Sequence, residues 1–148
     1  MLFDSSGIPG MFETVAMVYT ATKRLVSERL APYGITYPQW GALFGLSRHD
    51  GIRQVDLAKL IETDTTNAMV ICDGLEKKGW IVRTNDPSDR RANILRMTGE
   101  GRALMETTFA VVAGLYADAS RGISEKEADE VTGVLGRFLK IVMEKSDE

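Results

Sequence analysis

The sequence predicts a mainly α-helical fold with one small β-hairpin. Three observations predict it: apolar residues recur at helical spacing in several segments, a hairpin pattern runs through residues 80–97, and two short, closely consecutive helices precede that hairpin. The 148 residues suit one domain or one subunit of an oligomer, and the hydrophobic content of 44% is ordinary for a globular protein.

The N-terminal part predicts two helices. Residues 11–31 form the first, which Pro32 ends, and its apolar face is Phe12, Val15, Ala16, Tyr19, Val26 and Leu30. Thr36 and Gln39 have the spacing of a capping box at the start of the second. Gly41 and Gly45, four residues apart, are expected to let another helix approach closely.

Residues 54–75 predict two short helices joined by a tight turn. The first, residues 54–61, directs Leu57, Ala58 and Ile61 inward. The second begins near Thr63 or Asp64. Its expected buried face is Ala68, Ile71, Cys72 and Leu75, and its exposed face is Thr66, Asn67, Val70 and Asp73. Because residues 62–64 leave little room, the two helices must meet at a steep angle, as in a helix-turn-helix.

A β-hairpin is predicted after these helices. Gly79 suits the left-handed stop of the second helix. Residues 80–84 are rich in β-formers, residues 85–89 form a turn cluster, and residues 92–97 return as the second strand. Ile52 is expected to add a short third strand, and Thr98 to cap the next helix.

Two more helices complete the prediction. One runs from Thr98 toward Ser120 with Leu104, Thr108, Val111, Leu115 and Ala119 on one face. The last opens with a Ser124–Glu127 capping box and buries Val131, Val134, Leu135, Phe138, Leu139 and Val142. A small hairpin domain does not need so much apolar surface, so the long helices are expected to meet a partner. A monomeric helical bundle is the alternative.

The charge is unevenly distributed. The formal net charge of the chain is −3, which at face value argues against a nucleic-acid partner. Residues 77–102 nevertheless contain seven basic and three acidic residues, a net charge of +4, which leaves −7 for the remainder. A basic region on an acidic body is what a DNA-binding protein needs, although ordinary surface variation is an alternative explanation.

The order of helix, turn, helix and basic hairpin resembles the winged helix-turn-helix of the MarR family of bacterial transcription regulators. Three motifs support the resemblance: Leu75-Glu76-Lys77-Lys78-Gly79-Trp80-Ile81, the wing Asp86-Pro87-Ser88-Asp89-Arg90-Arg91, and the exit Leu95-Arg96-Met97-Thr98-Gly99-Glu100-Gly101. Met97-Thr98 stands where leucine-threonine is usual. The resemblance implies a single subunit, residues 1–148, with dimerisation helices at 11–35 and 99–146 around a winged helix-turn-helix at 36–98.

By this resemblance, we expect a homodimer that binds double-stranded, roughly palindromic operator DNA and acts as a ligand-responsive repressor. The residues expected to contact DNA are Gln54, Thr65, Thr66, Asn67, Val70, Asp89, Arg90 and Arg91. Asn67 would bond an adenine edge, and Val70 would meet a thymine methyl where many relatives carry a basic residue. An arginine of the wing, Arg90 or Arg91, would enter the minor groove while Asp89 braces Arg91.

Three further residues, Thr65, Thr66 and Gln54, are expected to contact DNA. Thr65 and Thr66 would bond a phosphate or meet a thymine methyl. Gln54 would bind a phosphate through its amide and the start of its helix. For the wing, an ordinary solvated turn with one surface ion pair is the alternative.

The family resemblance also implies a small aromatic acid as effector. Its expected binding residues are Tyr19, Arg24, Tyr37, Trp40 and Phe44, with Tyr33 as a further aromatic residue and Arg29 as the alternative to Arg24 for holding the carboxylate. Each aromatic side chain has an equally good explanation as part of the core or of the subunit interface.

Other function classes have weaker support. Cys72 lies on the inward helix face, which favours a buried core residue over a redox sensor. The sequence has one histidine, His49, and no metal-ligand spacing, glycine-rich phosphate loop or histidine-based catalytic pair, so no metal, cofactor or enzyme activity is expected. A helical ligand-binding protein or enzyme without DNA binding, and a wing that contacts protein, remain alternatives. No membrane segment or secretory signal is recognised, and one cysteine fits the cytoplasm.

Overall fold

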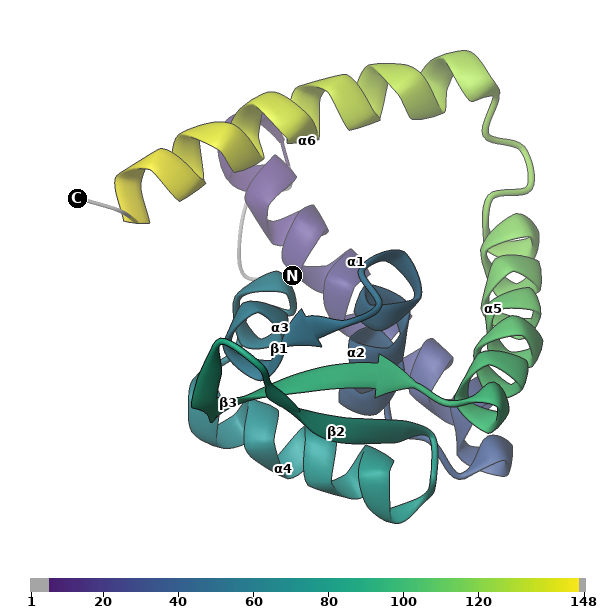
Figure 1. Ribbon diagram of the computed structural model, residues 1–148. Coiled ribbons are helices and arrows are strands. Elements are labelled where there is room, and N and C mark those ends of the chain that lie inside the picture. The colour runs from purple at the N-terminus through teal and green to yellow at the C-terminus, as the bar shows by residue number, and fades with distance from the viewer. Residues whose placement is uncertain (1–5, 147–148) are drawn as a thin grey trace. The chain divides into compact units, whose positions relative to one another are not determined.

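The computed structural model describes residues 6–146 and confirms a mainly helical chain with a small antiparallel sheet (Figure 1). Its elements are α1 (Gly7–Leu30), the 3-10 helix η1 (Ala31–Tyr33), α2 (Tyr37–Arg48), β1 (Ile52–Arg53), α3 (Gln54–Leu60), α4 (Thr65–Lys77), β2 (Ile81–Asp86), β3 (Asp89–Met97), α5 (Gly99–Ala119) and α6 (Glu125–Ser146). The expectation about a secretory signal falls partly on residues 1–5, outside the described residues.

The chain divides into two compact units, residues 1–113 and 114–148. The first contains α1 to α4, the sheet and most of α5, and the second contains the end of α5 together with α6. Within residues 6–146, no helix combines the length and the apolar character needed to cross a membrane.

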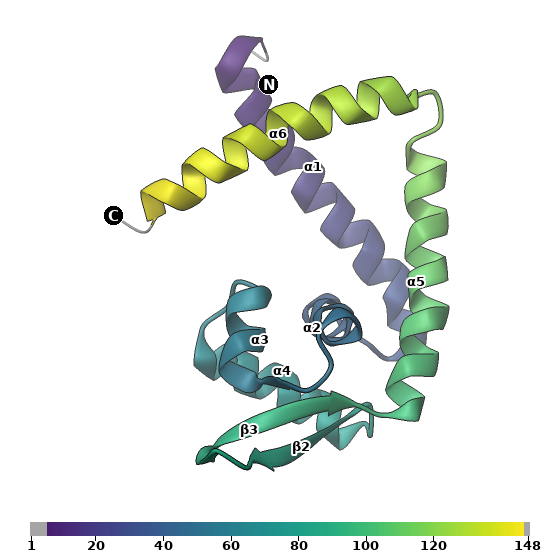
Figure 2. The ribbon, with the colours of Figure 1, turned by 45° about the horizontal axis from the view of Figure 1, so that its top comes forward.

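The sheet has the strand order β1-β3-β2, with both pairings antiparallel. Ile52 pairs with Leu95, which confirms the predicted third strand, and Ile81 pairs with Met97 at the far end of the hairpin. The register shifts between Asn85 and Asp86, where the wing turns. Figure 2 shows the sheet beside α2, α3 and α4, and α4 contacts β2 directly.

The core of the first unit is aliphatic and joins α2, α3, α4 and β3. Its fully buried leucines include Leu43, Leu46, Leu57, Leu75 and Leu95. The expected close approach occurs at Gly45, where a Cβ atom would lie 3.0 Å from Leu60 Cδ2 and 3.3 Å from Leu57 Cδ1 of α3. At Gly41 a Cβ atom would meet nothing within 4 Å, so the prediction is wrong for that glycine.

Several helix ends follow the predicted capping chemistry. Thr36 and Gln39 form the capping box of α2. Asp64 caps α4, because its Oδ1 accepts the Asn67 N–H at 2.7 Å. Gly79 has the left-handed backbone expected after α4, with φ of 74°. The first helix begins at Gly7, four residues before the predicted start.

The buried face of α5 differs from the prediction. Thr108 is fully buried as expected, but Met105 and Val112 are buried where Leu104 and Val111 were predicted, and those two are only half-buried. Trp40 Nε1 donates to Thr108 Oγ1 at 3.0 Å. This bond and the close approach of Gly101 to the Trp80 backbone fix the rotation of α5. Apolar periodicity alone could not predict either contact.

Helix α6, in the second unit, begins with the predicted capping box. Ser124 N–H donates to Glu127 Oε2 at 2.8 Å, and Glu127 N–H donates to Ser124 Oγ at 3.3 Å. The predicted burial of its apolar stripe is not found within one chain. Leu135 and Phe138 are half-buried, and the exposed members of the stripe are Val131, Val134, Leu139 and Val142.

Candidate nucleic-acid interface

One face of α4 is exposed and mostly polar, as the sequence predicts. It includes Thr65, Thr66, Asn67 and Val70, and the Val70 side chain is 60% exposed. Asn67 Nδ2 donates to Thr63 Oγ1 at 2.8 Å, so the amide is held at the start of the helix. The buried face, Ala68, Ile71, Cys72 and Leu75, confirms the helical periodicity.

The turn of the wing is fixed by Asp86 and Arg53. Asp86 Oδ1 accepts the backbone N–H of Ser88 at 2.9 Å and its hydroxyl at 2.7 Å. Asp86 Oδ2 accepts Arg53 Nε at 2.7 Å, and Arg53 Nη2 lies 2.6 Å away. The hydrogen bonds from Ser88, and then those from Arg53, outweigh the effect of burial and lower the pKa of Asp86 below its ordinary value. Arg53, at the N-cap of α3, therefore ties the helix-turn-helix to the wing.

Arg90 and Arg91 extend from the first residues of β3, next to the turn. Both are exposed, and no ion pair involves either of them within residues 6–146. Asp89 Oδ1 accepts the backbone N–H of Arg91 at 3.0 Å. The contact between Asp89 and Arg91 thus runs through the backbone, whereas the sequence led us to expect the guanidinium group.

Arg83 of β2 lies against α4. Its Nη2 is 2.6 Å from Asp73 Oδ1, and its Nη1 is 2.8 Å from Glu76 Oε2. Burial opposes the charged form, but the two carboxylates outweigh it and raise the pKa of Arg83 further. Arg83 Nε donates to the amide oxygen of Gln54 at 3.1 Å. Gln54, predicted to bind phosphate, is thus engaged in holding Arg83.

The basic residues of the wing region are not equally available. Arg83 is paired, and Arg102 Nη1 donates to the Met97 carbonyl at 2.8 Å. Lys78 Nζ donates to the Gly34 carbonyl and to Gln39 Oε1, and it lies 4.9 Å from the centre of the Trp80 ring. The positive charge that remains exposed and unpaired therefore includes the two arginines beside the wing turn.

Cys72 is fully buried, as predicted. Burial, the largest influence on this thiol, raises its pKa, although the nearby Arg83 acts in the opposite direction. A buried thiol with a raised pKa is a poor nucleophile at neutral pH.

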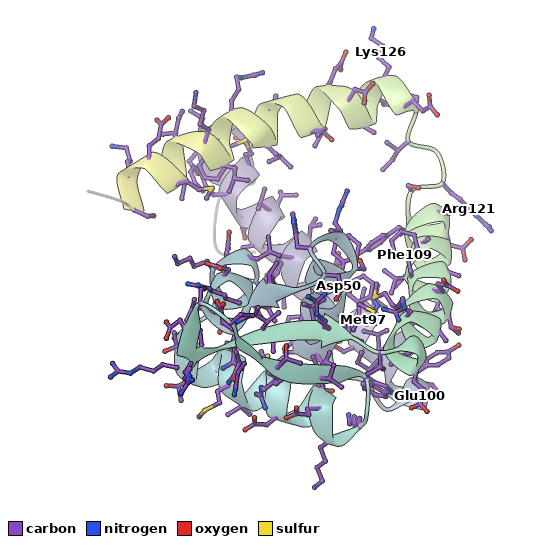
Figure 3. The ribbon with its side chains drawn as sticks, in the orientation of Figure 1. Asp50, Met97, Glu100, Phe109, Arg121 and Lys126 are labelled. Atoms are coloured by element: carbon purple, nitrogen blue, oxygen red, sulfur yellow. The ribbon has the colours of Figure 1, made fainter. Side chains whose placement is uncertain are left out.

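One hollow of the first unit includes Phe44 of the predicted effector residues in its lining, but not Tyr19, Arg24, Tyr37 or Trp40. This hollow has a volume of about 520 Å³ and is lined by Phe44, Leu46, Ser47, Arg48, Asp50, Met97, Arg102, Met105, Glu106 and Phe109. Figure 3 labels Asp50, Met97 and Phe109 around it. Only Phe44 belongs to the predicted set.

The other predicted effector residues lie elsewhere. Trp40 stacks on Phe44 with ring centres 5.7 Å apart, but its indole N–H is engaged with Thr108. Tyr19 is 59% exposed on α1, and Arg24 lies on α1 near Glu13, Met17 and Thr20. Lys23 Nζ lies 6.0 Å from the centre of the Tyr37 ring. The lining residues that the sequence did not predict come from α5, whose rotation was predicted incorrectly, and also from α2, the turn after it and the end of β3.

An exposed polar helix, a tight turn to a preceding helix and a basic hairpin define a winged helix-turn-helix protein. The model of the MarR family matches residues 35–92, which span α2, the helix-turn-helix and the wing turn. The family model and the solved structures described next confirm the resemblance that the sequence motifs predict.

Solved structures extend the similarity beyond that region. A mutant MarR from E. coli, complexed with operator DNA, is 27% identical with a TM-score of 0.81, over 89% of this chain and 94% of that chain. Wild-type MarR from E. coli in its apo form is 26% identical with a TM-score of 0.75, and the match covers 86% of this chain and 94% of that chain. A MarR regulator from Methanosarcina mazei Go1, at 20% identity and a TM-score of 0.84 over 92% and 98%, shares the fold.

Proposed function

We propose that this protein is a transcriptional regulator that binds specific double-stranded DNA as a homodimer in the cytoplasm. The observation that carries the proposal is the arrangement of α4: its exposed polar face stands beside a wing whose Arg90 and Arg91 are exposed. The E. coli MarR complexed with operator DNA has the same fold, which supports DNA as the partner.

In this proposal α4 enters the major groove and the wing contacts the neighbouring minor groove. Asn67 bonds an adenine edge, and Val70 meets a thymine methyl, so recognition by α4 favours A·T pairs. Thr65 and Thr66, at the start of α4, bond a phosphate or meet a thymine methyl. The arginines of the wing supply affinity that is largely independent of sequence.

The homodimer is proposed from the apolar surface of the flanking helices, residues 11–35 and 99–146. The exposed apolar side chains of α6 are Val131, Val134, Leu139, Ile141, Val142 and Met143, each at least 42% exposed. Apolar surface on this scale is typical of a protein–protein contact. A two-fold dimer presents two copies of α4, so the operator is expected to be roughly palindromic.

Release by a small aromatic acid is part of the proposal, with the hollow beside α5 as its site. Phe44 and Phe109 stack there with ring centres 6.2 Å apart, and the Arg48 guanidinium lies 5.5 Å from the Phe44 ring centre. The rings suit an aromatic ligand, and Arg48 and Arg102 suit its carboxylate. Ligand binding would favour a dimer whose α4 spacing does not match the operator.

Fluorescence anisotropy tests the proposal, with labelled DNA taken from upstream of the gene that encodes this protein. The wild-type protein should bind with a dissociation constant that rises linearly with salt on logarithmic axes. The Arg90→Ala/Arg91→Ala variant should bind all fragments about 10-fold to 100-fold more weakly, with the salt slope lowered by up to about 2.

A matched control is the Arg121→Ala/Lys126→Ala variant, which removes the same charge from exposed positions of the second unit (Figure 3). It should bind DNA like the wild type. A wild-type protein that binds no genomic fragment in a salt-sensitive manner would contradict the proposal.

A further inference from the structure

The recognition helix α4 carries acidic side chains where it is proposed to meet DNA. Asp73 follows Val70 by three residues and Thr66 by seven, so the three share one face of the helix. The Asp73 side chain is 59% exposed, and that of Glu76, about one turn farther on, is 42% exposed. Two unpaired carboxylates at this position would repel the phosphates of DNA.

Arg83 meets both carboxylates from the neighbouring strand. In addition to the ion pairs with Asp73 and Glu76, its Nη2 donates to the Met69 carbonyl at 3.4 Å and its Nε to Gln54 Oε1. Every nitrogen of the guanidinium group therefore has an oxygen partner inside the protein. The side chain is only 16% exposed, so it is poorly placed to bind a phosphate as well.

The same contacts join three elements. Gln54 is the first residue of α3, Asp73 and Glu76 belong to α4, and Arg83 belongs to β2. Glu76 Oε1 also accepts the backbone N–H of Arg83 at 3.3 Å, so this carboxylate holds both the side chain and the backbone of the strand. The planar fork of an arginine can meet several oxygens at once, which a lysine ammonium group does with less defined geometry.

We propose that Arg83 is the internal counter-ion of the recognition helix: it neutralises Asp73 and Glu76 and fixes α4 against β2, without contacting DNA. This inference rests on the proposed DNA-binding function. Arg83 is a positioning residue in this account, whereas Arg90 and Arg91 contact DNA. The two roles predict different responses to salt and to second substitutions.

Four variants separate these roles: Arg83→Gln, Asp73→Asn/Glu76→Gln, the triple combination of these changes, and Arg121→Gln/Asp118→Asn. The last removes an exposed ion pair of 2.8 Å in the second unit and is the matched control. Binding to a fragment that the wild type recognises is measured by anisotropy at several salt concentrations. The temperature is chosen so that circular dichroism shows every variant folded.

We expect Arg83→Gln to weaken binding about tenfold, because two carboxylates of α4 are then left unpaired. The triple variant should recover to within about threefold of the wild type and keep its salt slope, because no phosphate contact has been removed. The Asp73→Asn/Glu76→Gln variant should bind at least as tightly as the wild type, and the control variant should bind like it.

Other outcomes would overturn the inference. If the triple variant still binds DNA weakly and the slope of its salt dependence is lowered by about 0.9, Arg83 contacts a phosphate. If the triple variant still binds DNA weakly but keeps the wild-type salt slope, Arg83 holds α4 against β2 without acting as its counter-ion. In both cases wild-type binding, and with it the proposed function, would stand. A wild type without salt-sensitive binding would overturn both.

Discussion

Asp86 is the residue on which the shape of the wing turn depends most directly. It is only 6% exposed, and its two oxygens hold Ser88 on one side and Arg53 on the other. Because Arg53 precedes α3, the carboxylate connects the wing to the helix-turn-helix. The position of Arg90 and Arg91 relative to α4 therefore depends on a side chain that need not touch DNA itself.

Because of Asp86, the free energy of unfolding of the protein should depend on pH. The pKa of Asp86 is lower in the folded protein than in the unfolded chain, so its ionised form stabilises the fold at pH values above the ordinary carboxyl range. This stabilisation is lost as the pH falls through that range toward the folded pKa. Urea unfolding between pH 7 and pH 3 should therefore show a smaller loss of stability for Asp86→Asn than for the wild type. Equal losses would contradict this role for the carboxylate.

Cys72 should be unreactive in the native protein. It is fully buried and its pKa is raised, so thiolate is scarce and access is poor. A thiol-specific reagent such as DTNB should modify it only after urea unfolds the protein, with native labelling as slow as global unfolding. Rapid modification of folded protein with retained DNA binding would contradict this prediction.

Sequence reasoning recovered the exposed face of α4 and the basic wing, but not the roles of Arg53 and Arg83. Helical periodicity shows which side chains point outward, and turn residues show where a hairpin reverses. The Arg53–Asp86 contact joins residues 33 apart in the chain, and nothing in local periodicity predicts such a pair. Arg83 is one of the seven basic residues between 77 and 102, and its partners on α4, Asp73 and Glu76, become its neighbours only when β2 packs on that helix.

At the scale of elements, Gly101 determines how α5 meets the end of the hairpin. A Cβ atom at this position would lie 2.1 Å from the Trp80 carbonyl oxygen and 2.9 Å from Met97 Cγ. Thr98 completes the junction, since its hydroxyl donates to the Gly79 carbonyl at 2.7 Å and accepts the Gly101 N–H at 3.0 Å. The start of α5 is therefore fixed to the segment between α4 and β2.

Replacing Gly101 with alanine should destabilise the protein by about 1–3 kcal/mol, because the backbone at Trp80 must shift. Gly99→Ala is a matched control two residues away, where a Cβ atom meets nothing within 4 Å. Its effect should not exceed about 0.5 kcal/mol in either direction. Urea denaturation monitored by circular dichroism measures the free energy of unfolding of both variants. Equal destabilisation by the two substitutions would contradict the close approach at Gly101.

The capping boxes at Thr36 and Ser124 and the left-handed Gly79 were predictable, since each depends on residues within a few positions. The buried face of α5 was not predictable, because the Trp40–Thr108 hydrogen bond joins residues 68 positions apart in the chain. Four residues of α5, Arg102, Met105, Glu106 and Phe109, line the hollow of the first unit, so the incorrectly predicted face of α5 accounts for part of its unpredicted lining.

At the scale of the whole molecule, the exposed apolar stripe of α6 supports the proposed homodimer. Replacing Leu139 and Val142 with glutamate should produce a monomer, because each is more than 40% exposed in one chain and is expected to be buried against the partner. Lys140→Glu, at a 79% exposed position of the same helix, is the control and should remain dimeric. Sedimentation velocity distinguishes these outcomes, and a monomeric wild type would contradict the proposal.

In the proposed complex, two copies of α4 and two wings bind one duplex together. Hydroxyl-radical footprinting of the wild-type protein on its operator tests this claim most directly. We expect two symmetry-related protected regions whose centres lie about one helical turn, roughly 10 base pairs, or a multiple of it apart. A single unpaired footprint, or protection that is unchanged in the Arg90→Ala/Arg91→Ala variant, would contradict the account.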